Sequence, residues 1–240
     1  MELRGVTALV TGAAHRVGKA IALGLAGAGA DVVLHFHSSA SAAEATAAEV
    51  RSLGVSVALT SGDLAADPAA VLDGAGNLAP VQVLVNSAAV FPDDRIGDVS
   101  PEAWNRTLAI NLTAPVFLTQ AFARRLPDDL EGAVVNVTDW RTQRPYRDHF
   151  SYSVTKGALD TFTRAAAEAL APRIRVNAVA LGAILPPPGK DSAYLRDLAR
   201  EIPAQRIGGT EPVVMAVLAL VTNPFVTGEI LRVDGGAHLR

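Results

Sequence analysis

The chain has 240 residues, of which half are hydrophobic, with no cysteine and a formal net charge of −3 at pH 7. This length fits one large domain or two small ones, and the small net charge argues against binding to nucleic acid or to a membrane surface. Without cysteine the chain has no disulfide and no thiolate nucleophile. The five histidines also lack metal-ligand spacing, so no metal site is predicted.

Strand-like and helix-like segments alternate along the chain. Strands are predicted at residues 6–11, 31–36, 55–60, 81–85, 133–138, 174–180 and 229–233. Helices are predicted at residues 17–28, 41–53, 101–126 and 152–171, with short or irregular segments at 67–76 and 181–192. Ser100 and Pro101 mark the start of the third helix, which should bend near Pro115 because proline lacks a backbone N–H.

Apolar strands separated by helical crossovers predict a parallel sheet that is covered on both faces. No linker or repeat divides the chain, so residues 1–240 are expected to form a single doubly wound α/β domain with about seven strands. The chain opens with a strand-like segment, and no apolar run approaches the length of a membrane-spanning helix. A cytoplasmic enzyme is therefore expected.

The first strand leads into the segment Thr-Gly-Ala-Ala-His-Arg-Val-Gly at residues 11–18, and a helix follows at once. Gly12 and Gly18 suit a tight turn that approaches a pyrophosphate, whose charge is favoured at a helix N-terminus. Val17 lies in this turn, and Arg16 stands where a glycine is expected between the two. Arg16 is either a solvated side chain or a donor to phosphate or substrate.

Tyr152 and Lys156 lie four residues apart, so they share one face of a helix, and Asp139 precedes Tyr152 by thirteen positions. A cation beside Tyr152 should lower the pKa of the phenol towards catalytic use near neutrality. Asp139 is either part of this centre or a structural carboxylate paired with a nearby arginine, of which Arg141 is the nearest in sequence.

The second strand ends in His35-Phe36-His37-Ser38-Ser39, without the acidic residue that commonly holds a ribose 2′-hydroxyl. The missing acid leaves room for a 2′-phosphate, so NADP(H) is predicted rather than NAD. Ser38 and Ser39 are the expected hydroxyl donors, with Arg16, His15 or His37 as cationic partners. The alternative is that the serines only cap the next helix.

Together these motifs resemble the short-chain dehydrogenase/reductase family over essentially the whole chain, which implies a Rossmann fold. The resemblance implies adenine contacts by Asp63 and Leu64. It also implies cofactor contacts by Asn86, Ser87, Ala88, Gly182 and Ile184, and by the catalytic Tyr152 and Lys156. Asn111 resembles the family's helix asparagine, which supports a water relay to the catalytic lysine. The family is commonly tetrameric, so a homotetramer is expected, with the region 182–201, including Pro186, Pro187 and Pro188, as a lid over the substrate.

Three departures from the common family pattern resemble pteridine reductases. Asp139 replaces the usual serine, Arg16 replaces a turn glycine, and the segment at residues 32–39 is similar to the second strand of those enzymes. Phe91 also matches the aromatic residue that they carry shortly after the Asn86 motif. A flat, nitrogen-rich pterin requires a stacking face and in-plane polar partners. The expected substrate contacts are Arg16, Phe91, Asp139 and Tyr152, although Phe91 is alternatively a plain packing residue.

The expected reaction is NADPH-dependent reduction of a pteridine C=N bond, with proton supply by Tyr152 and Asp139. The alternative is a carbonyl reductase acting on a 3-oxoacyl or other ketone substrate. Asp139 argues against it, because a carboxylate repels a developing alkoxide, and Thr138 should point to the wrong side of its strand to replace serine. A third alternative is an NADP(H)-binding sensor without turnover.

Overall fold

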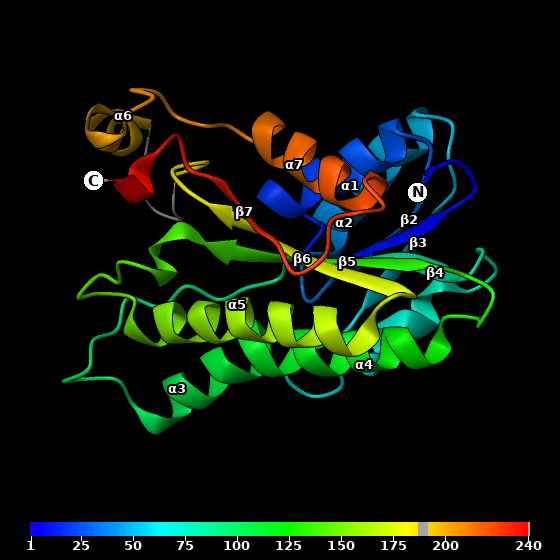
Figure 1. The fold of residues 1–240 in the computed structure, drawn as a ribbon, viewed down its shortest axis with the longest axis horizontal. Helices are drawn as coiled ribbons and strands as arrows, with labels where there is room; N and C mark the ends of the chain where they lie inside the picture. The colour runs from blue at the N-terminus through cyan, green and yellow to red at the C-terminus, as the bar shows by residue number, and fades with distance from the viewer. Residues whose placement is uncertain (187–191, 240) are drawn as a thin grey trace.

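The computed structural model describes residues 1–186 and 192–239, and their strands form one parallel sheet in the order β3-β2-β1-β4-β5-β6-β7. The predicted doubly wound α/β fold is therefore confirmed (Figure 1). The order reverses between β1 and β4, and the crevice at such a switch point is where ligands bind in open α/β sheets. The strands are β1 (Thr7–Val10), β2 (Asp31–Phe36), β3 (Val57–Ser61), β4 (Val81–Asn86), β5 (Gly132–Asp139), β6 (Ile174–Leu181) and β7 (Ile230–Val233).

Helices cover both faces of this sheet (Figure 1). One face carries α1 (Arg16–Gly27), α2 (Ala40–Ser52) and α7 (Glu211–Thr222). The other face carries α3 (Pro101–Leu108), α4 (Ala114–Arg125) and α5 (Phe150–Leu170), while α6 (Ser192–Glu201) lies apart from both layers. The central strands β1, β4 and β5 are buried almost throughout, as continuous apolar runs predict.

The bend in the predicted third helix has a different form from the one expected. A π-helical turn, Ala109–Thr113, separates α3 from α4, and Pro115 lies just beyond it in the first turn of α4. The predicted N-cap is confirmed, since the Ser100 hydroxyl accepts a hydrogen bond from the Ala103 N–H at 3.2 Å. Single π turns within helices are frequent at functional sites, and this one carries Asn111.

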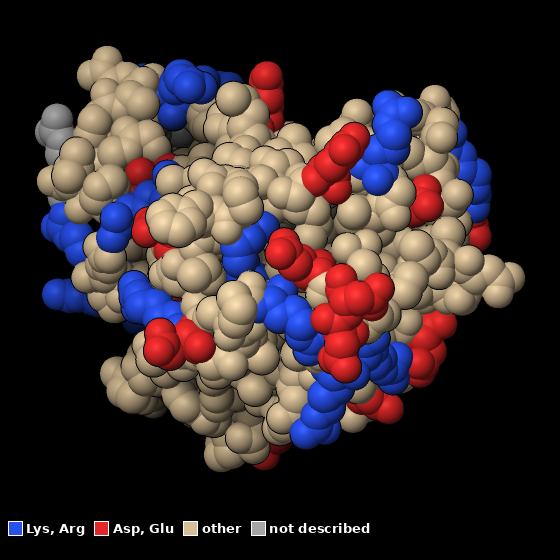
Figure 2. Space-filling model, turned by 45° about the vertical axis from the view of Figure 1, so that its right-hand side comes forward, with Lys and Arg blue, Asp and Glu red and all other residues tan. Residues whose placement is uncertain are grey.

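Three segments gain structure beyond the sequence prediction. The connecting segment at 67–76 contains a 3-10 helix, Ala69–Ala75, and the predicted elements leave α6 and α7 unassigned. In the described chain no helix is both long and apolar enough to cross a membrane. On the face shown in Figure 2, acidic and basic side chains lie interspersed rather than in separate fields, in keeping with the small net charge.

Candidate active site

The carboxyl ends of the central strands open into a cavity of about 460 Å³ at the switch point between β1 and β4. Residues from the first βα turn, from the ends of β2 to β5 and from α5 line it. Its predicted members are Gly12, Arg16, Val17, Gly18, His37, Asp63, Leu64, Ser87, Ala88, Phe91, Tyr152 and Lys156. Residues found only in the structure include Gly62, Arg106, Ile110 and Leu181.

The first βα turn is built by close backbone approaches. A Cβ atom on Gly18 would lie 2.3 Å from the Gly12 carbonyl oxygen, and one on Gly12 would lie 2.9 Å from the Ala88 Cα. Arg16 takes the left-handed conformation, with φ of 55°, at the position where a glycine was expected. Backbone this close to the start of α1 fits the pyrophosphate of a dinucleotide.

His35 holds this turn against the neighbouring strand, a role that sequence reasoning did not find. Its Nδ1 accepts a hydrogen bond from the Gly12 N–H at 3.3 Å, so the proton lies on Nε2, which donates to the Gly62 carbonyl at 3.2 Å. Burial lowers the pKa of His35, which keeps the ring neutral. The signal in the sequence was a polar side chain inside an otherwise apolar strand.

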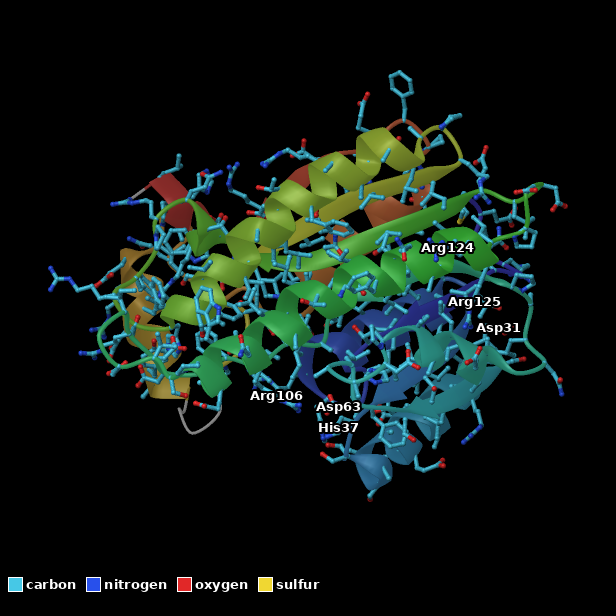
Figure 3. All side chains as sticks on the ribbon, turned by 90° about the horizontal axis from the view of Figure 1, so that it is seen from below. Asp31, His37, Asp63, Arg106, Arg124 and Arg125 are labelled. Atoms are coloured by element: carbon cyan, nitrogen blue, oxygen red, sulfur yellow. The ribbon has the colours of Figure 1, made fainter. Side chains whose placement is uncertain are left out.

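The end of the cavity beside β3 contains an ion pair between Asp63 and Arg106, which lie side by side with His37 in Figure 3. The Arg106 guanidinium donates to Asp63 Oδ2 at 3.0 Å, and the Ala65 N–H donates to Oδ1. The Ala65 N–H and Arg106 hold the pKa of Asp63 below its ordinary value. Sequence reasoning missed Arg106, because α3 is distant in the chain from the nucleotide motifs.

Several predicted cofactor residues lie outside the cavity lining. Ser39 occupies the N-cap position of α2, but its side chain makes no capping bond, so the capping alternative is not supported. Asn86 is buried, with its Nδ2 donating to Asn136 Oδ1 at 2.8 Å. A Cβ on Gly182 would lie 2.5 Å from the Asp234 Cα, and Ile184 lines a second cavity, beside β7. The remaining predicted residue of this group is Ser38, which is exposed.

At the predicted reaction centre, the Tyr152 hydroxyl donates to Asp139 Oδ2 at 3.1 Å. The other carboxylate oxygen, Oδ1, accepts the backbone N–H of Arg141 at 2.9 Å and caps a short 3-10 helix, Trp140–Thr142. The Lys156 ammonium donates to the Val137 carbonyl at 2.7 Å. The thirteen-residue and four-residue spacings therefore bring Asp139, Tyr152 and Lys156 to one place.

Asn111 joins this centre to the loop after β4. It is fully buried; its Oδ1 accepts the Val90 N–H at 2.9 Å, and its Nδ2 donates to the Val90 carbonyl and to Thr155 Oγ1. Because its side-chain atoms are engaged in this way, Asn111 fixes the loop and α5 relative to each other. Thr155 is the residue next to Lys156.

Burial raises the pKa of Asp139, and burial together with the adjacent Asp139 raises the pKa of Tyr152 well above 10. The expectation that Lys156 lowers the pKa of the phenol is therefore wrong for this arrangement. Burial lowers the pKa of Lys156 to about 8, against the attraction of Asp139 and Asp160. The centre thus holds a neutral phenol beside a carboxyl group that is unusually easy to protonate.

Thr138 belongs to the lining of the cavity, but its hydroxyl is buried and lies beside Asp160 of α5. The expectation that this hydroxyl is a poor substitute for the usual serine is therefore not contradicted. The strand β5 ends at Asp139, where the chain turns into the 3-10 helix. Asp139 itself lies behind Tyr152 rather than among the lining residues.

Beyond Tyr152, four further side chains gather around the loop after β4. Phe91 packs edge-to-face on the Tyr152 ring, with centroids 4.6 Å apart. The side chains of Asp93, Asp148 and His149 bring potential ligand atoms within 4.8 Å of one another, a grouping that no sequence spacing indicated. Acidic surface groups of this kind are common without a metal, so the grouping assigns none.

Residues 12–238 match the family model described as enoyl-(acyl carrier protein) reductase. The chain belongs to the short-chain dehydrogenase/reductase family. This confirms the family predicted from the nucleotide turn and from the Tyr152 and Lys156 pair. Family membership accounts for the parallel sheet and for the position of the cavity at its switch point.

Within this family the chain is similar to proteins with different substrates. It is 34% identical to FolM alternative dihydrofolate reductase 1 from Brucella canis in complex with NADP, with a TM-score of 0.96 over 100% of this chain and 96% of that one. It is 36% identical to L-xylulose reductase from Bos taurus, over 98% of each chain. The reductase LugOII, which catalyses keto-reduction at C1 during lugdunomycin biosynthesis, has a TM-score of 0.92 at 30% identity, over 100% of each chain. The predicted use of NADP(H) agrees with the first of these structures.

Proposed function

We propose that this protein is an NADPH-dependent oxidoreductase that reduces a pteridine of the dihydropterin or dihydrofolate type. The observation that carries the proposal is the hydrogen bond from the Tyr152 hydroxyl to Asp139 Oδ2 at 3.1 Å. A carboxyl group at this position suits a substrate whose reaction ends in protonation of a ring nitrogen. The similarity to FolM dihydrofolate reductase supports the same substrate class.

NADP(H) is the proposed cofactor, and when bound it supplies the hydride. The turn around Gly12 and Gly18 fits its pyrophosphate, since any side chain at these positions would clash with backbone. His37, Ser38 and Ser39 follow β2 without an acidic residue; His37 and Ser38 are exposed and Ser39 is half-buried, and their polar groups suit a 2′-phosphate. Asp63 and Leu64 are the proposed adenine contacts.

The chain's own residues handle the proton. Tyr152 stays neutral because its pKa is raised, so it can donate its proton to a substrate nitrogen. Asp139 holds the phenol in place, and its raised pKa allows it to return a proton to the phenolate. Lys156 is the proposed ribose contact, and Asn111 is a positioning residue that holds the loop before Phe91.

Three further features belong to this proposal. The region 182–201 is the proposed lid. It is supported by the hydrogen bond from the Arg16 guanidinium to the Pro186 carbonyl at 2.6 Å, while Pro187 and Pro188 lie outside the described residues.

A homotetramer is supported by exposed Phe117 on α4 and Val154 on α5, and light scattering of the purified protein tests it. A cytoplasmic location is proposed as well, and fractionation of cells tests it.

The second candidate function is reduction of a carbonyl group. The similarities to L-xylulose reductase and to LugOII favour it. Asp139 argues against it, because a carboxylate would repel the alkoxide that forms. A sensor that binds NADP(H) without turnover is the third candidate, and any substrate-dependent oxidation of NADPH excludes it.

The deciding experiment follows NADPH absorbance with dihydrobiopterin, dihydrofolate and L-xylulose, for the wild type and for Asp139→Ser. We expect pterin-dependent oxidation that falls about 100-fold in Asp139→Ser, because the phenol loses its proton partner. Tyr152→Phe is the control for the centre as a whole and should lose activity on every substrate. Ketone activity that is unchanged or improved in Asp139→Ser would instead establish the carbonyl reductase.

A further inference from the structure

His149, three residues before Tyr152, covers one face of the Phe91 ring. The two ring centroids lie 3.7 Å apart at an interplanar angle of 16°, and Phe91 meets Tyr152 at 89°. Phe91 lines the cavity and is 43% exposed, so at most one of its faces is free for a ligand. The imidazole therefore connects, through Phe91, to the phenol at the reaction centre.

An uncommon backbone conformation and a hydrogen bond of the ring place His149 at this stack. His149 takes φ of 52° and ψ of 42°, a left-handed conformation that is uncommon for a residue with a Cβ atom. Its Nδ1 lies 2.6 Å from the Pro92 carbonyl oxygen. Since a carbonyl only accepts, Nδ1 carries the proton and donates. The ring is thus bonded to the residue after Phe91 while it covers Phe91 itself.

A buried carboxylate locks the same loop to the start of α5. Asp94 Oδ1 accepts the Ser151 N–H at 3.0 Å, and its Oδ2 accepts the Ser151 hydroxyl. The Phe150 N–H donates to the Asp94 carbonyl at 3.1 Å. Asp94 is 7% exposed. The loop that carries Phe91 and the first turn of the helix that carries Tyr152 therefore form one unit, and His149 is the ring at their junction.

We propose that His149 is a positioning residue that fixes Phe91 as a rigid aromatic wall, and that this wall selects planar ring substrates over small aliphatic ones. A ring that is stacked on one face against a parallel partner cannot rotate away from a ligand. Binding to its other face therefore does not require a mobile side chain to become ordered. The inference rests on the proposed function for the identity of the planar substrate, a pteridine. It also predicts that planar ligands bind even where no turnover occurs.

The test compares two substitutions at one position. His149→Asn removes the ring and tolerates the left-handed backbone, whereas His149→Phe keeps a stacking ring and loses the Nδ1 donor. Trp104→Leu is the matched control, because it removes the ring that stacks on the neighbouring Phe150 at 5.9 Å. Thermal denaturation is recorded for all three variants.

The readouts are kcat and KM for dihydrobiopterin and for L-xylulose, with calorimetric Kd values for NADPH and for folic acid in the presence of NADP+. In His149→Asn we expect KM and Kd for the planar ligands to rise about three- to tenfold, the range for one aromatic pair. The kcat and the NADPH affinity should change less than about twofold. His149→Phe should restore planar binding, and Trp104→Leu should leave it unchanged.

Three results in the variants would overturn the inference. The first is unchanged affinity for planar ligands in His149→Asn, and the second is an equal loss of affinity for planar and aliphatic ligands in that variant. The third is an affinity for planar ligands in His149→Phe that is as low as in His149→Asn. A wild type that binds no planar ring overturns it as well. Binding of folic acid that depends on His149, without reduction of any pterin, would support the wall while the proposed function fails.

Discussion

Lys156 is the group of the centre whose charge changes within the working pH range. Burial lowers the pKa of Lys156 to about 8, while Asp139 and Asp160 attract its charge and oppose this shift. Tyr152 stays protonated at these pH values because its pKa is raised. The alkaline limb of NADPH binding should therefore reflect loss of the Lys156 proton as the pH rises through about 8.

Neutralising Asp160 tests whether deprotonation of Lys156 controls the alkaline limb of NADPH binding, because the expected shift of that limb has a definite direction. Asp160→Asn removes an attraction that raises the pKa of Lys156, so the pKa falls and NADPH binding should weaken at a lower pH than in the wild type. The measurement is Kd for NADPH against pH. Glu168→Gln, which neutralises an exposed carboxylate of the same helix, is the control and should leave the limb in place. An alkaline limb that does not move in Asp160→Asn would show that another group controls binding.

How far the sequence predicted the site differs from residue to residue. Local spacing was sufficient for Tyr152 and Lys156, because four residues on a helix fix a shared face. It could not predict the pKa of the phenol, which depends on burial and on Asp139 rather than on the nearby lysine. Arg106 escaped prediction because its partner Asp63 is 43 residues away in the chain.

At the scale of elements, continuous apolar runs located every strand to within about two residues, since buried parallel strands require them. The helix α7 was missed because its segment, Glu211–Thr222, is apolar on nearly all sides and has no amphipathic period. The π turn before α4 was anticipated only as a bend near Pro115. The turn carries Asn111, whose hydrogen bonds to Val90 and Thr155 are tertiary contacts that a local sequence pattern does not specify.

The start of α1 allows an element-scale prediction. Gly18→Ala would place a Cβ atom 2.3 Å from the Gly12 carbonyl, so the turn must open to accept it. Overpacking of this kind costs about 1–3 kcal/mol, and we expect NADPH affinity to fall at least about tenfold. Calorimetric titration with NADPH measures the change.

Gly27, near the other end of the same helix, provides the matched control. A Cβ atom there would meet nothing within 4 Å, so Gly27→Ala should leave NADPH binding unchanged and stabilise the protein by up to about 1 kcal/mol. Equal losses of affinity in both variants would mean that the helix as a whole, and not the close approach to Gly12, determines binding.

At the scale of the whole molecule, two arginines flanking Ile174 tie the helices of opposite faces to the sheet. Arg173 donates to the carbonyls of Ala123, Leu126 and Pro127 at the end of α4. Arg175 donates to the carbonyls of Leu220 and Val221 near the end of α7, and to the Val226 carbonyl beyond it. Each guanidinium thus satisfies carbonyls that a helix C-terminus leaves unpaired and adds a favourable charge there.

Arg175→Ala should therefore loosen the layer formed by α7. Three charge-assisted hydrogen bonds are lost and part-buried carbonyls are left without donors, so we expect the free energy of unfolding to fall by about 2–3 kcal/mol. For a chain of this size the corresponding drop in Tm is about 4–12 °C. Arg4→Ala, at an exposed position, is the control and should shift Tm by less than about 2 °C. The helix α7 packs on α1, which begins at the nucleotide turn, so Arg175→Ala should also weaken NADPH binding. A loss of stability with unchanged NADPH affinity would show that α7 and the nucleotide turn act independently.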